Sequence, residues 1–259
     1  MAHGRLARVV ISGLPHHVTG LVGWVAERSD VNQLRSETAM GFAALYPSYG
    51  PETTMDKIDF KKKLATLYSA PQGSFAAVDV PVMTFVKIDG KGDPNRDPAY
   101  KRAVEWLYSL SYAMKFASKT QSGKDYVVPP LEGLWWADNP DDFAGRRKHL
   151  WQWTMMIMVP DFVERSLYEA ALARSRDKLG EPPASLRLEP LDEGRCLQTL
   201  HIGSYDDEGP TLARLHDEIM PAMGMTFAGS HHEIYLSDAR KTPPEKLKTI
   251  LRQPVRSAS

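Results

Sequence analysis

The segment Leu131–Trp135 (LEGLW) has a near match about a hundred positions further along the chain, in His232–Leu236 (HEIYL). In each segment one glutamate stands among leucine, isoleucine and aromatic residues, a composition typical of β-strands. Two more pairs of segments match in the same order: Val86–Gly90 with Leu200–Gly203, and Met156–Pro160 with Ile250–Pro254. The alignment sets Glu132 against Glu233, 101 positions later, and Gly90 against Gly203, 113 positions later. A duplicated unit with length changes in its loops accounts for this order.

The residues between the matched segments follow the order strand, helix, strand, strand, twice. In the first copy, periodicity predicts a strand at 80–88, a helix at 98–119 and strands at 126–136 and 150–159. In the second copy it predicts strands at 186–190 and 195–203, a helix at 208–223 and strands at 231–236 and 247–253. A short amphipathic helix is expected at 56–69, and another helix at 160–179 with Asp161 as its N-cap. The pattern therefore predicts an α+β fold made of a duplicated βαββ module.

The expected architecture has two antiparallel sheets related by pseudo-twofold symmetry. Each helix would cover one face of its own sheet, and the other face would meet the twin sheet. A central ligand cleft is then expected at the junction. We place this domain at residues 55–259, with its first half at about 55–160 and its second half at about 161–259.

Residues 1–54 have a different character from the rest of the chain. A short apolar run at 8–12 is followed by glycine, proline and histidine, and little periodicity appears before Pro51. We expect these residues to be an appended, largely disordered leader and not part of the domain. No helix-turn-helix pattern occurs in them, which argues against a transcription regulator.

The overall composition excludes several classes of protein. Lys plus Arg and Asp plus Glu both total 32, so no net charge favours nucleic acid or an anionic membrane. Cys196 is the single cysteine, which excludes an internal disulfide and fits a reducing compartment. No apolar run is long enough to span a membrane. We expect a cytoplasmic protein with no nucleic-acid or membrane partner; the oligomeric state stays open.

Four segments resemble the GyrI-like family of small-molecule-binding domains. They are Pro129–Trp136 (PPLEGLWW), Leu200–Asp207 (LHIGSYDD), His231–Asp238 (HHEIYLSD) and Pro243–Arg252 (PPEKLKTILR). The resemblance is closest to the stand-alone members, some of which are implicated as hydrolases that open the cyclopropane ring of DNA-alkylating toxins. In regulators of the family, the glutamate that corresponds to Glu233 lies in the cleft and receives cationic drugs.

Glu132 and Glu233 are the predicted catalytic residues. Residues two apart in a strand share a face, so Tyr235 should accompany Glu233, and Leu134 and Trp136 should accompany Glu132. If both glutamates face the groove, one could activate water while the other holds a proton. Trp136 and Tyr235 would stack on a flat ligand, with Leu134 beside them. The weaker candidates, expected at the rim of the cleft, are Tyr112, Tyr205 and His201.

These residues and the family resemblance are compatible with two functional hypotheses. The first is a detoxifying hydrolase that adds water to a strained, electrophilic ring; the second is a non-catalytic protein that sequesters a hydrophobic or planar drug or binds gyrase. No cofactor is predicted. A metal site at His231-His232-Glu233 is disfavoured, because no further ligands follow at a recognisable spacing. Trp135, Trp151, Trp153 and Cys196 are expected to be core residues.

Overall fold

The computed structural model describes residues 56–139, 142 and 145–258, so the prediction of a disordered leader at 1–54 lies outside the described residues. The first half contains the helices α1 (Phe60–Lys63), α2 (Ala65–Tyr68) and α3 (Pro98–Ser122) and the strands β1 (Ala76–Val80), β2 (Met83–Lys91), β3 (Leu131–Trp136) and β4 (Gln152–Met158). The second half contains α5 (Arg165–Leu179), α6 (Gly209–Arg214), α7 (Met220–Ala222), β5 (Arg187–Leu191), β6 (Gly194–Ile202), β7 (Met225–Phe227), β8 (His231–Tyr235) and β9 (Lys248–Ser257). Short 3-10 turns lie at Lys148–Leu150, Tyr205–Asp207 and Pro244–Lys246.

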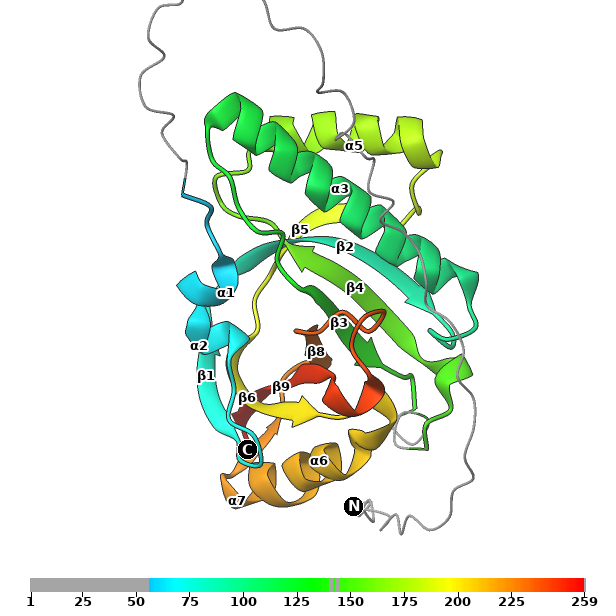
Figure 1. Cartoon of the computed structure of the whole chain (residues 1–259). Helices are drawn as coiled ribbons and strands as arrows, with labels where there is room; N and C mark the ends of the chain where they lie inside the picture. Colours follow the sequence, from blue (N-terminus) through cyan, green and yellow to red (C-terminus); the bar gives the residue numbers. More distant parts are fainter. Residues whose placement is uncertain (1–55, 140–141, 143–144, 259) are drawn as a thin grey trace, which may run out of the picture.

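The strands of the described residues form one antiparallel sheet, in the order β1-β6-β9-β8-β3-β4-β2-β5, with β7 paired to β9. The sheet is strongly curled, and its helices lie around it (Figure 1). The α+β class and the duplicated module are confirmed, but the expectation of two separate sheets facing each other is wrong. The halves join edge to edge: β3 of the first half pairs with β8 of the second, so neither strand leaves an unpaired edge at the junction.

The two halves also exchange a strand. β1, from the first half, pairs with β6 of the second, whereas β5, from the second half, pairs with β2 of the first. The first strand of each unit therefore lies at an outer edge of the other unit's part of the sheet. This exchange makes the nine strands a single structural unit.

The pairing of β3 with β8 locates the pseudo-twofold axis. Gly133 lies directly opposite Glu233, which is 100 positions later, and adding 100 to each β3 residue from Leu131 to Trp135 gives its counterpart in β8. The two flanking pairs, Glu132 with Ile234 and Leu134 with His232, exchange under this operation. The axis therefore passes between Gly133 and Glu233.

The loops before the main helices follow the same symmetry. Gly92 and Gly203 both have positive φ, 108° and 151°, and both precede a turn that leads to a helix N-cap, at Asp97 and Glu208. The differences 203 − 92 and 208 − 97 both equal 111. The predicted correspondence of Gly90 with Gly203 is thus two residues out of register.

Several predicted elements differ in their bounds. The strand predicted at 80–88 is a pair of strands interrupted at Pro81, because proline has no N–H to donate to a ladder. The helix predicted at 160–179 begins at Arg165, with Glu164 and not Asp161 at the N-cap. The helix predicted at 208–223 contains a π-helical turn at Leu215–Ile219, a feature that pattern alone does not reveal.

Helices lie on both faces of the sheet. We call the face that carries Glu233 the Glu233 face and the opposite one the Glu132 face. On the Glu233 face, Tyr100 of α3 contacts the rings of Trp135 and Trp153, at centroid distances of 6.1 and 5.3 Å. On the Glu132 face, the hydroxyl of Tyr68 in α2 reaches Glu132. α5 packs on α3 as an outer layer.

Two clusters of apolar side chains make the core. The larger cluster joins both halves through Phe85, Trp106, Met155, Ile234 and Ile250, all at most 1% exposed. The smaller cluster, Leu197, Leu215, Met220 and Val255, fastens the segment from α6 to α7 to the sheet. Within the described residues, no helix is long and apolar enough to cross a membrane.

Candidate functional site

The register of β3 and β8 places the two predicted catalytic glutamates on opposite faces of the sheet. Residues directly opposite each other in neighbouring strands share a face. Glu233 is opposite Gly133, whereas Glu132 is opposite Ile234. The prediction that both carboxylates face one groove is therefore wrong. The alignment used an offset of 101 where the fold has 100, and a slip of one residue reverses every side chain of a strand.

Glu132 belongs to a buried polar network on its own face. Its carboxylate accepts a hydrogen bond of 2.9 Å from the Tyr68 hydroxyl and lies 3.0 Å from Nε2 of His232, its pseudo-symmetric counterpart. Nδ1 of His232 lies 2.9 Å from Glu193, which in turn pairs with Arg252 at 3.3 Å. Two carboxylates and two basic groups thus alternate without contact with solvent.

The Glu132 network fastens α2 to the sheet. The guanidinium of Arg252 donates to the carbonyl oxygen of Leu67 at 2.6 Å and to Oε1 of Gln198 at 3.0 and 3.1 Å. The Gln198 amide donates to the carbonyl oxygens of Thr66 and Ser69. Buried charges of this kind are tolerated when every member has partners. This arrangement indicates that Glu132 has a structural role.

Burial alone would lower the pKa of His232, but the charge of Glu193 and hydrogen bonds to both glutamates raise it to about 9. Burial likewise opposes ionisation of Glu193, yet His232 and Arg252 bring the pKa of that carboxyl down to about 2. His232 is therefore an imidazolium held between carboxylates at neutral pH.

Glu233 lies in a second cluster on the other face. Its side chain is 8% exposed, and Oε2 accepts a hydrogen bond of 2.7 Å from the hydroxyl of Tyr235. That hydroxyl accepts in turn from Nε1 of Trp135, at 2.9 Å. Trp135 and Tyr235 are counterparts under the symmetry, so the two halves meet in a hydrogen-bonded chain that ends on Glu233. Trp135, expected only as a core residue, also orients this site.

Gly133 leaves the space in which this chain forms. A Cβ atom there would lie 2.8 Å from Nε1 of Trp135, 3.0 Å from Sδ of Met155 and 3.2 Å from the hydroxyl oxygen of Tyr235. Ordinary contacts between such atoms are longer than 3.4 Å. The counterpart of Glu233 is thus a glycine because any side chain at position 133 would collide with Trp135, Met155 and Tyr235.

Glu208 is the second carboxyl of the site, and the sequence analysis did not single it out. It is 3% exposed and stands at the N-cap of α6, but its side chain makes no capping hydrogen bond. Asp97, its counterpart, does cap α3 by accepting from the N–H of Ala99 at 2.8 Å. The Glu208 carboxyl instead turns inward to within hydrogen-bonding reach of Glu233. From the sequence we expected only that a helix begins near each of these positions, which gives no signal for this difference.

The two carboxyls have pKa values shifted in opposite directions. Burial, followed by the negative charge of Glu233, raises the pKa of Glu208 well above its usual range. Burial also acts to raise the pKa of Glu233, but His231, with Nε2 3.5 Å from Oε1, and then Tyr235 and Glu208 lower it. These opposite shifts favour a pair in which Glu208 keeps its proton while Glu233 is ionised.

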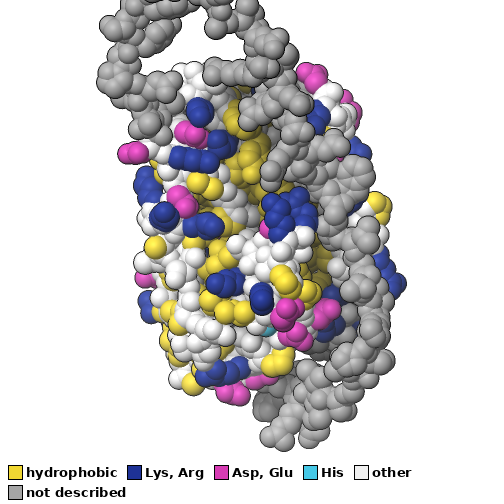
Figure 2. Space-filling view, viewed as in Figure 1, with side chains coloured by type: hydrophobic (Ala, Val, Ile, Leu, Met, Phe, Trp, Pro, Cys, Tyr) yellow, Lys and Arg dark blue, Asp and Glu magenta, His cyan; other side chains and the backbone are white. Residues whose placement is uncertain are grey.

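Tyrosine rings surround this carboxyl pair. Tyr205 meets Tyr235 edge to face, with ring centroids 5.6 Å apart. Burial first, and then the charge of Glu233, raise the pKa of Tyr100 and of Tyr205, so both hydroxyls stay protonated as donors. Towards the surface, the rings of Tyr108, Tyr112 and Phe116 stack along α3 at centroid distances of 6.4 and 6.3 Å. Figure 2 shows hydrophobic side chains gathered along the middle of the visible face, with charged side chains on either side.

The structure brings together only some of the predicted ligand-binding residues. Tyr235 and Tyr205 lie beside Glu233, and Tyr112 lies on α3 with 47% of its surface exposed. Leu134 and Trp136 lie on the Glu132 face, so the prediction that they line the same groove as Glu233 is wrong. His201 lines a separate groove between β6 and α6. Among the described residues, no group of three or more His, Cys, Asp and Glu side chains is placed to hold a metal ion.

A buried carboxyl pair beneath aromatic rings, between two pseudo-symmetric units, is an arrangement typical of proteins that bind small molecules. The model of the GyrI-like small-molecule-binding domain matches residues 75–256. The chain therefore belongs to the GyrI-like family, and its domain is a small-molecule-binding domain.

Solved structures similar to this chain come from Listeria innocua. One is an uncharacterized conserved protein with 38% sequence identity and a TM-score of 0.70, over 77% of this chain and 100% of that chain. Two more are hydrolases, with 38% and 37% identity and TM-scores of 0.67, over 77% and 78% of this chain and 100% of theirs. Among proteins of curated function, none matches this sequence.

Proposed function

We propose that the chain is a hydrolase that adds water to a strained, electrophilic ring of a planar small molecule, such as the cyclopropane of a DNA-alkylating toxin. The observation that carries this proposal is the pair Glu208 and Glu233, two buried carboxyls whose pKa values are shifted in opposite directions. Such a pair supplies a general acid and a general base in the same site. The hydrolases among the similar structures support the same class of reaction.

The proposed reaction uses one water and returns the pair to its starting state. Glu233 accepts a proton from water while the water oxygen bonds to a ring carbon. The ring bond breaks, and its electron pair moves through the conjugated system to the carbonyl oxygen of the substrate. Glu208 donates its proton to that oxygen. The proton on Glu233 then passes back to Glu208 through their hydrogen bond, so the net change is the addition of water.

The tyrosines have positioning and binding roles in this proposal. Tyr235, itself held by Trp135, fixes the orientation of the Glu233 carboxylate. The stacked rings of Tyr108 and Tyr112 offer a flat surface for a planar ligand. Since Glu208 and Glu233 are 3% and 8% exposed, the electrophilic end of the ligand must displace side chains to reach them.

The test is multiple turnover of a cyclopropane-bearing alkylating agent by a substoichiometric amount of protein, followed by mass spectrometry. Many equivalents of the agent should gain the mass of one water. The Glu233→Gln and Glu208→Gln variants should lose at least about a hundredfold in rate, the usual contribution of acid–base groups. Glu132→Gln is the matched control: it is also a buried glutamate of the same strand pair, but on the opposite face, and it should keep most of the rate. Full activity of Glu208→Gln, or loss confined to Glu132→Gln, would refute the proposed mechanism.

A second candidate is sequestration of a cationic or planar drug without chemistry. The specific observation in its favour is that the Glu233 carboxylate is ionised among tyrosine rings, which suits a delocalised cation. The turnover experiment separates the two functions. Sequestration protects at most one equivalent of the agent per protein and leaves its mass unchanged.

A further inference from the structure

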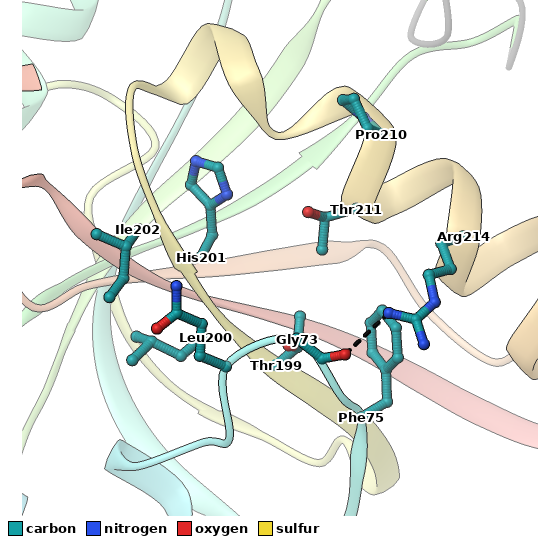
Figure 3. A pocket seen from close by; sticks show the side chains of 10 residues that line it. Gly73, Phe75, Thr199, Leu200, His201, Ile202, Pro210, Thr211 and Arg214 are labelled. Carbon is teal, nitrogen blue, oxygen red and sulfur yellow. Dashed lines mark hydrogen bonds between the residues drawn. The ribbon is translucent and has the colours of Figure 1, made fainter. Parts of the chain in front are cut away.

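A groove of about 380 Å³ opens on the Glu233 face between β6, α6 and the segment that leads into β1. Figure 3 shows Arg214 and Phe75 at one end, His201 and Ile202 at the other, and Thr211 directed into the space between them. The volume lies at the small end of the range for ligand sites, about 300–1,000 Å³.

The pseudo-symmetry explains why a space exists here. Trp135 is opposite Trp153 and Tyr235 is opposite Thr249, so Thr249 is the counterpart of Trp153. Thr211 is likewise the counterpart of Tyr100, because both lie three residues after the N-caps at Asp97 and Glu208.

In the first half, the rings of Tyr100 and Trp153 meet edge to face at 5.3 Å and fill the space between helix and sheet. The Trp153 ring packs so closely over Gly90 that a side chain at that glycine would collide with it. In the second half, Thr211 and Thr249 stand in the places of these two large aromatic side chains, and His201 stands in the place of Gly90; Thr211 and His201 line the groove. With an aromatic side chain at position 211, as at Tyr100 in the first half, the groove would be filled.

The charge of the side chains that line the groove favours an anionic ligand. None of the residues that line it is acidic, and within the described part of the chain no ion pair with Arg214 is formed. Nη1 of Arg214 donates to the carbonyl oxygen of Gly73 at 2.9 Å, and the guanidinium lies 5.7 Å from the centre of the Phe75 ring. These contacts orient the guanidinium and leave its other N–H groups available to a ligand.

The remaining walls of the groove include an apolar side chain and a histidine ring that a hydrogen bond holds in place. Phe75 supplies apolar surface, whereas the side chains of Leu200 and Ile202, which flank His201 in β6, point to the other face of the sheet. Nε2–H of His201 donates to the carbonyl oxygen of Ser204 at 3.0 Å, which holds that ring in place. A ligand with a compact apolar group beside one anionic group therefore matches Phe75 and Arg214.

We propose that this groove is a second ligand site, which takes a small monocarboxylate with a compact apolar group. The carboxylate pairs with Arg214 and accepts from the hydroxyl of Thr211, and the apolar group lies against Phe75. One strand, β9, lies between β6 of the groove and β8, which carries Glu233, whereas Glu208 stands two residues before Pro210 at the border of the groove. The side chains proposed to hold this ligand, Arg214 and Thr211, have no part in the reaction assigned to Glu208 and Glu233.

The test is an NMR titration of the full chain, labelled with ¹⁵N, with 3-phenylpropionate and its neutral analogue 3-phenylpropanamide. The carboxylate should bind with a Kd of about 1 mM or below and shift the amide signals of β6 and α6. The amide should bind at least about tenfold more weakly, since a charge-assisted pair is lost.

Two variants and a control complete the experiment. Arg214→Gln should weaken binding by about tenfold or more, whereas Arg174→Gln, at an exposed arginine of α5, should leave it unchanged. Thr211→Tyr restores the first-half side chain and should abolish binding while the spectrum of the rest of the domain is kept. Equal binding of acid and amide, an unchanged Kd in Arg214→Gln, or signal shifts around Glu233 in place of β6 would each overturn the proposal, as would no binding at all.

Discussion

Replacing Gly133 by alanine tests the geometry of the site most directly. The added Cβ would lie 2.8 Å from Nε1 of Trp135 and 3.2 Å from the hydroxyl oxygen of Tyr235, so both rings must move apart. Overpacking a rigid core costs about 1–3 kcal/mol, and loss of the hydrogen bond between the two rings adds about 1 kcal/mol. We therefore expect the free energy of unfolding to fall by about 2–4 kcal/mol.

The assay is urea unfolding followed by tryptophan fluorescence, together with near-ultraviolet circular dichroism of the folded state. Gly209→Ala is the matched control, because Gly209 also has no positive φ and no atom lies within 4 Å of its added Cβ. That control should change stability by no more than about 1 kcal/mol. If Gly133→Ala unfolds at the same urea concentration as the parent and keeps the aromatic circular dichroism, the close approach of Trp135 and Tyr235 over Gly133 is refuted.

Three further outcomes follow from the contacts of individual side chains. Tyr235→Phe removes the donor to Oε2 of Glu233, so the pKa of Glu233 should rise. The acidic limb of the pH profile of kcat/KM should then move to higher pH. An unmoved limb contradicts the positioning role of Tyr235. The pKa of His232 is raised to about 9 from an unfolded value of about 6.5, so its contribution to stability is fully present below about pH 6.5 and is lost as pH rises through 9. The pKa of Glu193 is lowered to about 2, so its contribution to stability is present above about pH 4.5 and is lost as pH falls through 2. Urea unfolding measured across both pH ranges checks the two contributions. A free energy of unfolding that stays constant above pH 6.5 contradicts the contribution of His232. Thr249 buries a hydroxyl that has no hydrogen-bond partner among the residues that the structure describes, so Thr249→Val should raise the free energy of unfolding by about 1 kcal/mol; a fall measured by the same method would show that the hydroxyl is satisfied.

The repeated order of strands and helix could be predicted because it depends on local properties. Alternation of apolar residues, β-branched composition and capping residues are all features of short stretches of chain, and they located β3, β4, β6, β8 and α3 to within a few residues. Similarity to the GyrI-like family was likewise carried by contiguous segments such as His231–Asp238.

The partner of Glu233 could not be predicted in the same way. Glu132 is excluded by which residues face each other across β3 and β8, and this register joins strands about a hundred residues apart. Glu208 is brought to Glu233 by the loop that precedes α6, not by any strand. An alignment that pairs the glutamates by identity is chemically reasonable, yet it is one position from the structural one. One position was enough to move Glu132 to the opposite face.

By itself, the sequence determined the α+β class, the duplicated unit, the balanced charge and the presence of a glutamate and a tyrosine two apart on one strand face. Only the tertiary structure decided that the halves form one sheet, that Glu208 turns inward from an N-cap, and that Glu132 belongs to a buried network with His232. The physical reason is that secondary structure follows from neighbouring residues, whereas the pairing of carboxyls and the filling of a groove depend on side chains that meet only after the two halves have joined.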